Sequence, residues 1–256
     1  MNTTKKKPTA RERSPARKTG AVTCESVGLD PALYASALRY LFDRPVPADN
    51  EAEWFWNMDE PNFEAMPLQW VHIQTVLFAN SATDLEPYSD EQVGLGLNYV
   101  MSNGVSDVSH MVNDRSVPLA EAMRMMKALP ALWRDCIGPR MGDAQQTESG
   151  KKRLGFACFN WFDAWPSFWS AKHLPEWRDA MWNVLCDMLS SPWRDVQMAA
   201  LDSLADDGCY LERPEQVQAL IEAFLRNLRG DEELRTFALH AASMNAQAAT
   251  IHQTDK

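Results

Sequence analysis

The sequence lacks most of the short motifs that mark common enzymes. Its 256 residues contain no Cys-x-x-Cys pair, His-Glu-x-x-His run, phosphate-binding Gly-x-x-x-x-Gly-Lys-Ser/Thr loop or Gly-x-Ser-x-Gly elbow. The sequence therefore shows none of the usual signatures of zinc proteins, P-loop nucleotide-binding proteins or serine hydrolases. The five cysteines are odd in number and widely spaced, which indicates reduced, structural thiols rather than a disulfide framework. We therefore predict no cofactor and no metal.

Long apolar runs and strand patterns are also missing. No run approaches the roughly 20 residues that a membrane-spanning helix needs, and the basic start of the chain is not followed by the apolar segment of a secretory signal. We expect no membrane insertion and a cytoplasmic location. No segment alternates β-branched and polar residues, and neither Asn-Gly nor Asp-Gly joins two such segments. This pattern predicts an all-α fold.

The charge is unevenly distributed. Residues 1–20 contain seven basic residues and one glutamate, a balance of +6, so the rest of the chain carries −16 of the total of −10. An acidic body repels phosphates, which makes nucleic acid an unlikely ligand for the folded part and favours a basic protein partner. We interpret residues 1–28 as a disordered basic leader, favoured over a segment that touches nucleic acid or an anionic membrane.

Several local signals predict where helices begin. Asp30 before Pro31 is a cap followed by a proline in the first turn, and Pro67 opens a second amphipathic segment. Ser89, followed three residues later by Gln92, forms a capping box. Gly94 and Gly96 then lie inside the helix, where each costs about 1 kcal/mol relative to alanine. We expect close helix–helix approach as the compensation.

The last third of the chain contains a near-repeat. PEWRDAMWNVLCDMLSSPWRDVQMAALDSLADDG begins at Pro175, and PEQVQALIEAFLRNLRGDEELRTFALHAASMN begins at Pro214. Their first halves match at an offset of 39 and their second halves at 38. A weaker third copy extends back through RLGFACFNWFDAW, after a segment, 138–152, that looks like an exposed loop. A two-helix unit of this length predicts a stacked helical array.

These units resemble HEAT-like repeats, mainly over residues 175–246. The resemblance rests on an acidic residue before an apolar one and then an Ala-Leu pair, here Ala200-Leu201 and Ala238-Leu239. It implies an α-solenoid of stacked antiparallel helix pairs in which that pair fills the inter-helix groove. The predicted organisation is the leader, an irregular helical part at 29–116 and repeats at 117–250, the last two forming one continuous domain.

Solenoids usually act by presenting a surface, so we expect a protein-binding module rather than an enzyme. By analogy with the second helices of stacked repeats, and because aromatic residues often anchor interfaces, the candidate partner-binding residues are Asp163, Trp165, Trp193, Arg194, Asp202, Asp206, Glu233 and Arg235. The favoured hypothesis is a bacterial immunity-type protein that neutralises a basic toxin or effector domain. A scaffold or adaptor is the alternative, and an enzyme using Asp202, Asp206 and His240 is the second alternative.

Overall fold

The computed structural model describes residues 22–48, 51–57, 59, 62–142 and 146–254. Every regular element within these residues is a helix, which confirms the predicted all-α fold. No stretch of helix among them has the length and apolarity that crossing a membrane requires. The α-helices are α1 (Cys24–Val27), α2 (Pro31–Phe42), α3 (Pro67–Asp84), α4 (Asp90–Met101), α5 (Leu119–Ala128), α6 (Gly138–Met141), α7 (Glu148–Phe159), α8 (Trp161–Ala164), α9 (Pro166–Ala171), α10 (Pro175–Leu189), α11 (Arg194–Asp207), α12 (Pro214–Asn227) and α13 (Glu232–Thr254). The 3-10 segments are η1 (Trp54–Trp56), η2 (Asp107–Asn113) and η4 (Gly208–Leu211), and η3 (Leu132–Ile137) is π-helical.

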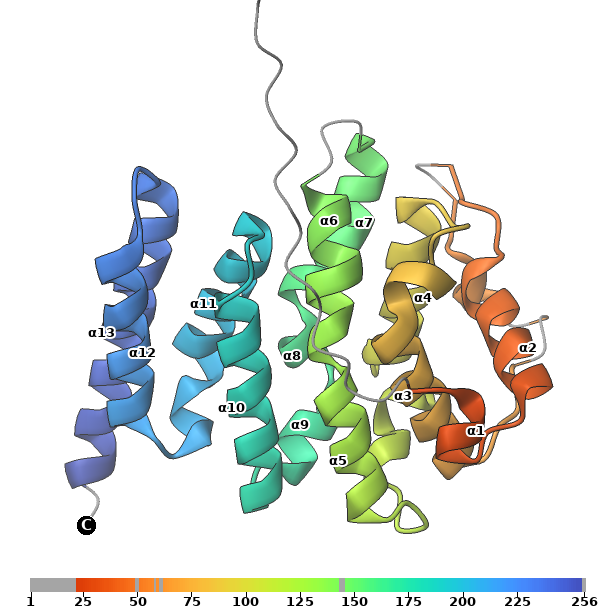
Figure 1. The fold of residues 1–256 in the computed structure, drawn as a ribbon, viewed down its shortest axis with the longest axis horizontal. Helices are drawn as coiled ribbons and strands as arrows, with labels where there is room; N and C mark the ends of the chain where they lie inside the picture. The colour runs from red at the N-terminus through yellow and green to blue at the C-terminus, as the bar shows by residue number, and fades with distance from the viewer. Residues whose placement is uncertain (1–21, 49–50, 58, 60–61, 143–145, 255–256) are drawn as a thin grey trace, which may run out of the picture.

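The near-repeat coincides with two helical hairpins. The first consists of α10 and α11 and the second of α12 and α13, and the turn inside each hairpin lies at the same end of the molecule (Figure 1). One layer of packed helices runs from α4 through α7 and α11 to α13. In the other layer α3 contacts α5, and α5 contacts α10. The second helices of the hairpins therefore share one side of the molecule.

Helix starts follow the predicted local signals. The Asp30 side chain accepts a hydrogen bond from the Ala32 backbone N–H at 2.8 Å, and Pro31 opens α2. Ser89 and Gln92 form the expected reciprocal capping box, in which Ser89 Oγ accepts from the Gln92 N–H and Gln92 Oε1 accepts from the Ser89 N–H. These bonds satisfy backbone donors that the first turn of a helix leaves without partners.

The two glycines inside α4 lie at close helix contacts, as expected. A Cβ built on Gly94 would sit 2.5 Å from the Arg153 carbonyl carbon and 2.7 Å from the Leu154 backbone nitrogen of α7. A Cβ on Gly96 would sit 2.4 Å from the Phe42 ring. The cost of glycine in the helix is thus offset by packing that no larger residue permits.

Tryptophan rings fill the junction between the N-terminal helices and the repeat region. Trp161 and Trp165 are at most 1% exposed. Their ring centroids lie 6.0 Å apart, and Trp161 contacts Trp133 while Trp165 contacts Trp177. This chain of edge-to-face contacts joins α8, η3 and α10 into one core.

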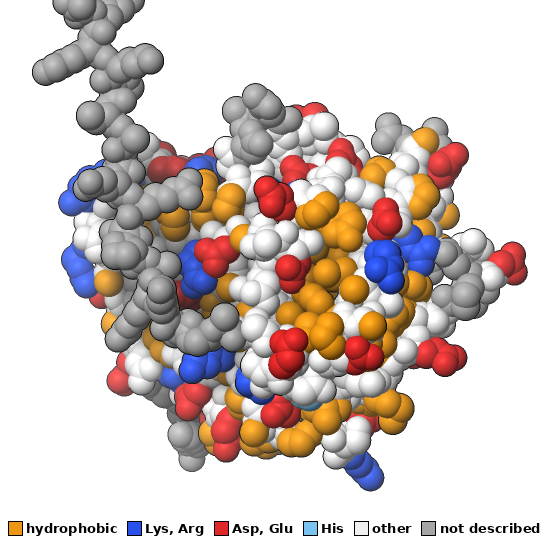
Figure 2. All heavy atoms as spheres, turned by 45° about the vertical axis from the view of Figure 1, so that its right-hand side comes forward, with side chains coloured by type: hydrophobic (Ala, Val, Ile, Leu, Met, Phe, Trp, Pro, Cys, Tyr) orange, Lys and Arg blue, Asp and Glu red, His pale blue; other side chains and the backbone are white. Residues whose placement is uncertain are grey.

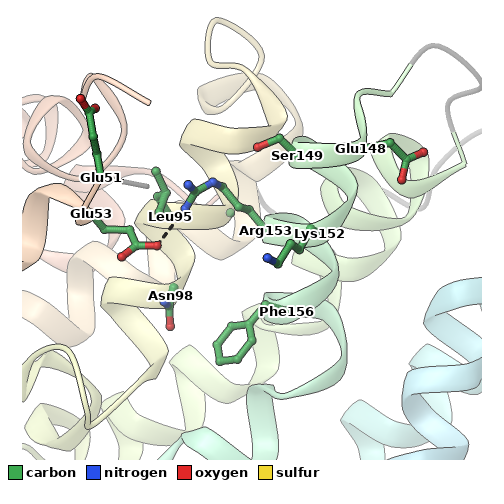
Figure 3. A pocket seen from close by; sticks show the side chains of 10 residues that line it. Glu51, Glu53, Leu95, Asn98, Glu148, Ser149, Lys152, Arg153 and Phe156 are labelled. Carbon is green, nitrogen blue, oxygen red and sulfur yellow. Dashed lines mark hydrogen bonds and ion pairs between the residues drawn. The ribbon is translucent and has the colours of Figure 1, made fainter. Parts of the chain in front are cut away.

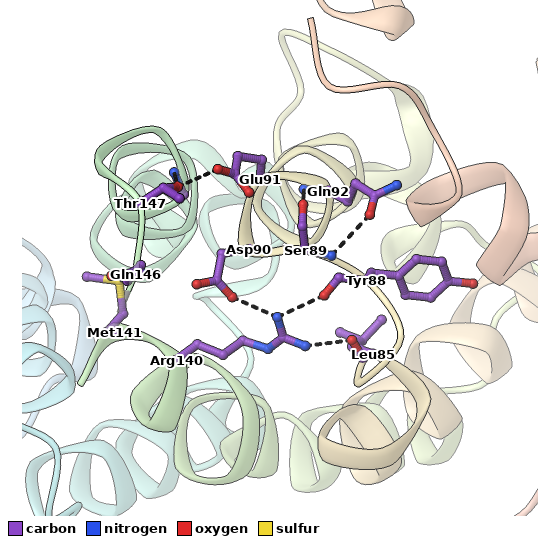
Figure 4. Close-up of polar contacts among 11 residues, drawn as sticks. Leu85, Tyr88, Ser89, Asp90, Glu91, Gln92, Arg140, Met141, Gln146 and Thr147 are labelled. Atoms are coloured by element: carbon purple, nitrogen blue, oxygen red, sulfur yellow. Dashed lines mark hydrogen bonds and ion pairs between the residues drawn. The ribbon is translucent and has the colours of Figure 1, made fainter. Parts of the chain in front are cut away.

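Arg140 fixes α6 against the turn between α3 and α4 (Figure 4). Its guanidinium donates to the Leu85 carbonyl oxygen at 2.6 Å, to the Tyr88 carbonyl oxygen at 3.1 Å and to Asp90 Oδ1 at 2.7 Å. Both partners of the ion pair are largely buried, with 19% and 20% of their side chains exposed. The planar fork of arginine serves all three acceptors at once, which the single ammonium of lysine does not match.

We expect Arg140→Met to lower the free energy of unfolding by about 2–4 kcal/mol, because it leaves two carbonyl groups and a carboxylate without their donor. Arg134→Met is the matched control, since Arg134 pairs with Asp135 and Asp187 at the surface, where ion pairs contribute about 1 kcal/mol or less. Urea denaturation followed by circular dichroism measures both. Equal losses in the two variants would contradict a special role for Arg140.

Two predicted loop or disordered segments are wrong in part. Residues 23–28 form α1 and its cap, because Thr23 and Ser26 make a capping box and Gly28 ends the turn with a positive φ. The prediction of disorder for residues 1–21 lies outside the described residues. The segment 138–152, predicted as an exposed loop, contains α6 and the start of α7. Gly138 is buried against Trp193, whose ring a Cβ there would meet at 2.2 Å, so the start of the segment is packed rather than exposed.

The predicted Ala-Leu groove holds for one repeat and fails in part for the other. Ala200, Leu201 and Ala238 are fully buried, but Leu239 is 54% exposed. Leu239 lies on a side of α13 that the described residues leave largely uncovered. The Ala-Leu pattern alone therefore does not determine whether the leucine is buried.

The aromatic residues Trp54–Trp56 form the 3-10 segment η1. Trp54 stacks on Tyr99 with centroids 5.0 Å apart, and the Arg44 guanidinium lies 4.7 Å from the Trp54 ring. Trp56 remains 51% exposed. Figure 2 shows a band of hydrophobic side chains on this N-terminal side of the molecule, with carboxylates around it. The N-terminal part thus also leaves apolar surface uncovered.

Candidate functional site

Four aspartates from two helices lie close together. Asp202, Asp206 and Asp207 are at the end of α11, and Asp163 is on α8. The spacing of four residues places Asp202 and Asp206 on one face of α11. The Asp163 carboxylate contributes to raising the pKa of both Asp202 and Asp207, so it acts electrostatically on the α11 carboxyls. We call these four residues the acidic cluster.

The members of the acidic cluster lie at different depths. Asp163 and Asp206 are exposed, whereas Asp202 is half-buried. Burial, and then the Asp206 carboxylate, raise the pKa of Asp163. Burial, Asp206 and Asp163 raise the pKa of Asp202, while His240 on α13 acts in the opposite direction. Each negative charge therefore makes ionisation of its neighbours less favourable.

Asp207 is the deepest member, at 2% exposure. Burial, together with Asp163 and Asp206, raises its pKa to about 7, although the Lys172 ammonium acts in the opposite direction. Its Oδ2 atom has no hydrogen-bond partner among the described residues. A carboxyl group in such a place titrates near neutral pH and gains from any donor or cation that reaches it.

An aromatic pair holds the lysine that influences Asp207. The Lys172 ammonium lies 4.4 Å from the centroid of the Trp169 ring and 3.6 Å from that of Tyr210. The two rings meet edge to face at 4.8 Å. This arrangement restrains Lys172 by cation–π contact beside the cluster.

Several predicted site residues serve the fold. The Arg194 guanidinium pairs with Asp231 Oδ2 at 2.7 Å and with Glu233, and so ties the start of α11 to the start of α13. Arg235 pairs with Glu232 one turn earlier on α13 at 3.8 Å. The structure therefore brings Asp163, Asp202 and Asp206 together but gathers Arg194, Glu233 and Arg235 around the starts of α11 and α13.

The two predicted tryptophans are not free surface anchors. Trp165 is 1% exposed and packs in the core between Trp161 and Trp177, so its ring is not presented to a partner. Trp193 is half-buried. Its indole N–H donates to the Arg134 carbonyl oxygen at 3.0 Å, and its ring covers Gly138. The Trp193 ring packs here because Gly138 has no side chain to block it. The two residues are far apart in sequence, so the sequence does not reveal this contact.

The residues of the predicted enzyme alternative are neighbours in part. His240 is exposed on α13 and acts electrostatically on Asp202. No group of three or more histidine, cysteine or acidic residues in the described chain is arranged to hold a metal ion. The enzyme hypothesis keeps its direct test, which is alanine at Asp202, Asp206 and His240 followed by assay of any activity found for the protein.

Sequence reasoning left Asp207 and Lys172 out of the predicted site. Asp207 follows the exposed Asp206 directly, but adjacent residues of a helix face different directions, so one carboxyl is exposed and the next is buried. Lys172 directly follows α9, a different helix from the one that carries Asp207. No family model, curated protein or solved structure matches the chain.

Proposed function

We propose that the protein is a binding module that holds a basic partner protein against the acidic cluster. The observation that carries the proposal is the grouping of Asp163, Asp202 and Asp206 with the buried Asp207, in which burial and then neighbouring carboxylates raise the pKa values of Asp163, Asp202 and Asp207. Lysine or arginine side chains from a partner would relieve that repulsion. The net charge of −16 outside residues 1–20 adds long-range attraction.

The architecture supports the same reading. We propose that the hairpins α10–α11 and α12–α13 are HEAT-like units of a short α-solenoid, in which the second helix α11 carries three members of the cluster and α8 carries the fourth. Repeat arrays of this kind offer extended surfaces rather than catalytic clefts. Among binding functions we favour an immunity-type role, in which an acidic surface covers a basic active-site region of a toxin or effector domain inside the cell that makes both.

We expect Asp163→Asn combined with Asp202→Asn and Asp206→Asn to weaken capture of the basic partner by at least about tenfold, equivalent to about 1.4 kcal/mol. The matched control is Glu176→Gln with Glu215→Gln and Glu222→Gln. These three glutamates are exposed on α10 and α12, and their substitution removes the same amount of negative charge from helices that do not carry the acidic cluster. Affinity capture from the native host, quantified by mass spectrometry, makes the comparison. Equal recovery of basic proteins with both triple variants would contradict the proposed surface.

Deletion of the gene in the native host separates immunity from scaffolding. An immunity role predicts loss of viability that is relieved by removing the captured partner. A scaffold predicts loss of an assembly with no such relief. Growth of the single and double deletion strains distinguishes the two outcomes.

A further inference from the structure

A cleft of about 640 Å³ lies between α4, α7 and the segment that precedes η1 (Figure 3). Its volume falls in the range of about 300–1,000 Å³ that is typical of small-molecule sites. It is built from segments about 50 residues apart in sequence, and α8, α11 and α13, which carry the acidic cluster and His240, do not line it. The proposed protein-binding function makes no use of it.

Three acidic and two basic side chains line the cleft, and a basic one reaches its centre. Arg153 donates to Glu53 Oε1 at 3.1 Å, so these two charges neutralise each other. Figure 3 shows the Glu51 and Glu148 side chains directed away from the middle of the cleft, whereas Lys152 extends into it from α7. Lys152 forms no ion pair with a described residue. The centre of the cleft therefore offers the ammonium of Lys152 to a ligand, and the carboxylates of Glu51 and Glu148 stand at its edge.

Two neutral polar side chains also line the cleft. Ser149 lies one turn before Lys152 on α7, and Figure 3 shows it at the upper end of the cleft, above Arg153. Asn98 lines the opposite wall, and its buried Oδ1 has no hydrogen-bond partner among the described residues. Rotation of the carboxamide exchanges its two ends, so Asn98 offers a ligand either a donor or an acceptor.

The apolar part of the cleft comes from Leu95 on its floor and Phe156 at its lower edge. Phe156 is 42% exposed although it belongs to a well-packed helix. An exposed ring next to a lysine and polar side chains is the combination that small-molecule sites use, with apolar contact for affinity and few polar groups for orientation.

We propose that this cleft binds a small monocarboxylate that carries a planar apolar group, of the type of an N-acylated aromatic amino acid. Its carboxylate meets Lys152 Nζ and the Ser149 hydroxyl, its ring packs on Phe156 and Leu95, and its amide meets Asn98. One negative charge matches one unpaired ammonium. A phosphate dianion adds a second charge in a wall that already contains three glutamates, which favours the carboxylate.

The test uses calorimetric titration of the full chain with N-acetylphenylalanine as the probe. We expect binding that is lost with N-acetylphenylalanine amide, which lacks the charge. Lys152→Met is expected to weaken binding about tenfold through loss of a charge-assisted contact, and Phe156→Ala to weaken it through loss of the ring contact. Lys151→Met is the matched control, because Lys151 is exposed on the same helix and does not line the cleft.

The proposal is overturned by no measurable binding at millimolar probe, or by equal binding to Lys152→Met and wild type. Tighter binding of adenosine monophosphate than of the carboxylate would assign the cleft to phosphates instead, and preference for phenethylamine would assign it to cations. Circular dichroism of each variant confirms that a loss of binding is not a loss of fold. None of these results bears on partner capture by the acidic cluster.

Discussion

Asp207→Asn is expected to raise the free energy of unfolding at pH 8 by on the order of 2–4 kcal/mol and to leave it nearly unchanged below pH 4. Asparagine has nearly the shape of the protonated carboxyl group and cannot ionise. The substitution therefore removes the cost of a negative charge at a site that is 2% exposed and lies beside two other carboxylates.

The sign follows from the raised pKa. Asp207 keeps its proton in the folded chain up to about pH 7, whereas the unfolded carboxyl loses it near its ordinary value of 3.8. Between these values the folded state binds more protons, so the contribution of Asp207 to stability is full below about pH 4 and is lost as the pH rises through 7. Wild-type stability should fall over this window relative to the variant.

Thermal and urea unfolding at pH 4, 6 and 8 measure the effect. Asp206→Asn is the neighbouring control: its carboxylate is exposed, so we expect a much smaller gain from relief of repulsion alone. A gain for Asp207→Asn that does not depend on pH would show that the carboxyl is not the origin of the effect.

Gly94→Ala is the second substitution with a large expected effect. We expect it to lower the free energy of unfolding by about 2–4 kcal/mol, although alanine favours a helix by about 1 kcal/mol over glycine. The added methyl group would meet backbone atoms of Arg153 and Leu154 at 2.5 and 2.7 Å, and backbone cannot rotate aside as a side chain does. The helices α4 and α7 would have to separate.

The matched control for this prediction is Gly104→Ala. A Cβ at Gly104 meets only the Ser102 hydroxyl at 3.7 Å, an ordinary contact, so its effect should stay within about 0.5 kcal/mol. Urea denaturation monitored by circular dichroism compares the two variants. Similar stabilities for both would show that α4 and α7 are not held at the distance described.

Gly94 and Asp207 illustrate which features of the structure can be predicted from the sequence and which cannot. Helix starts at Asp30, Pro67 and Ser89, and the need for close approach at Gly94, are local in cause and were predictable. The burial of Trp165 and the exposure of Leu239 were not predictable, because they depend on which helix lies opposite each residue. Asp206 and Asp207 make the same point for the site, since these adjacent identical residues face different directions on α11 and the surrounding helices decide which direction is buried.

The cleft beside Lys152 had no signal in the sequence for a related reason. Its walls come from the segment before η1, from α4 and from α7, and no repeat or motif links these three regions. Predicting the cleft requires knowing that α4 packs on α7. The two glycines of α4 indicate a close helix contact but not which helix makes it. Sites formed by distant segments depend on tertiary structure that a single sequence does not specify.

The measurement that tests the central claim most directly is the affinity of the captured basic partner for the wild-type chain and for the two charge-matched triple variants, determined by calorimetry at two salt concentrations. We predict that the Asp163, Asp202 and Asp206 variant binds at least about tenfold more weakly and shows a reduced salt dependence, while the Glu176, Glu215 and Glu222 variant stays close to wild type. Equal affinity for both variants, or the larger loss in the α10–α12 variant, would contradict binding at the acidic cluster.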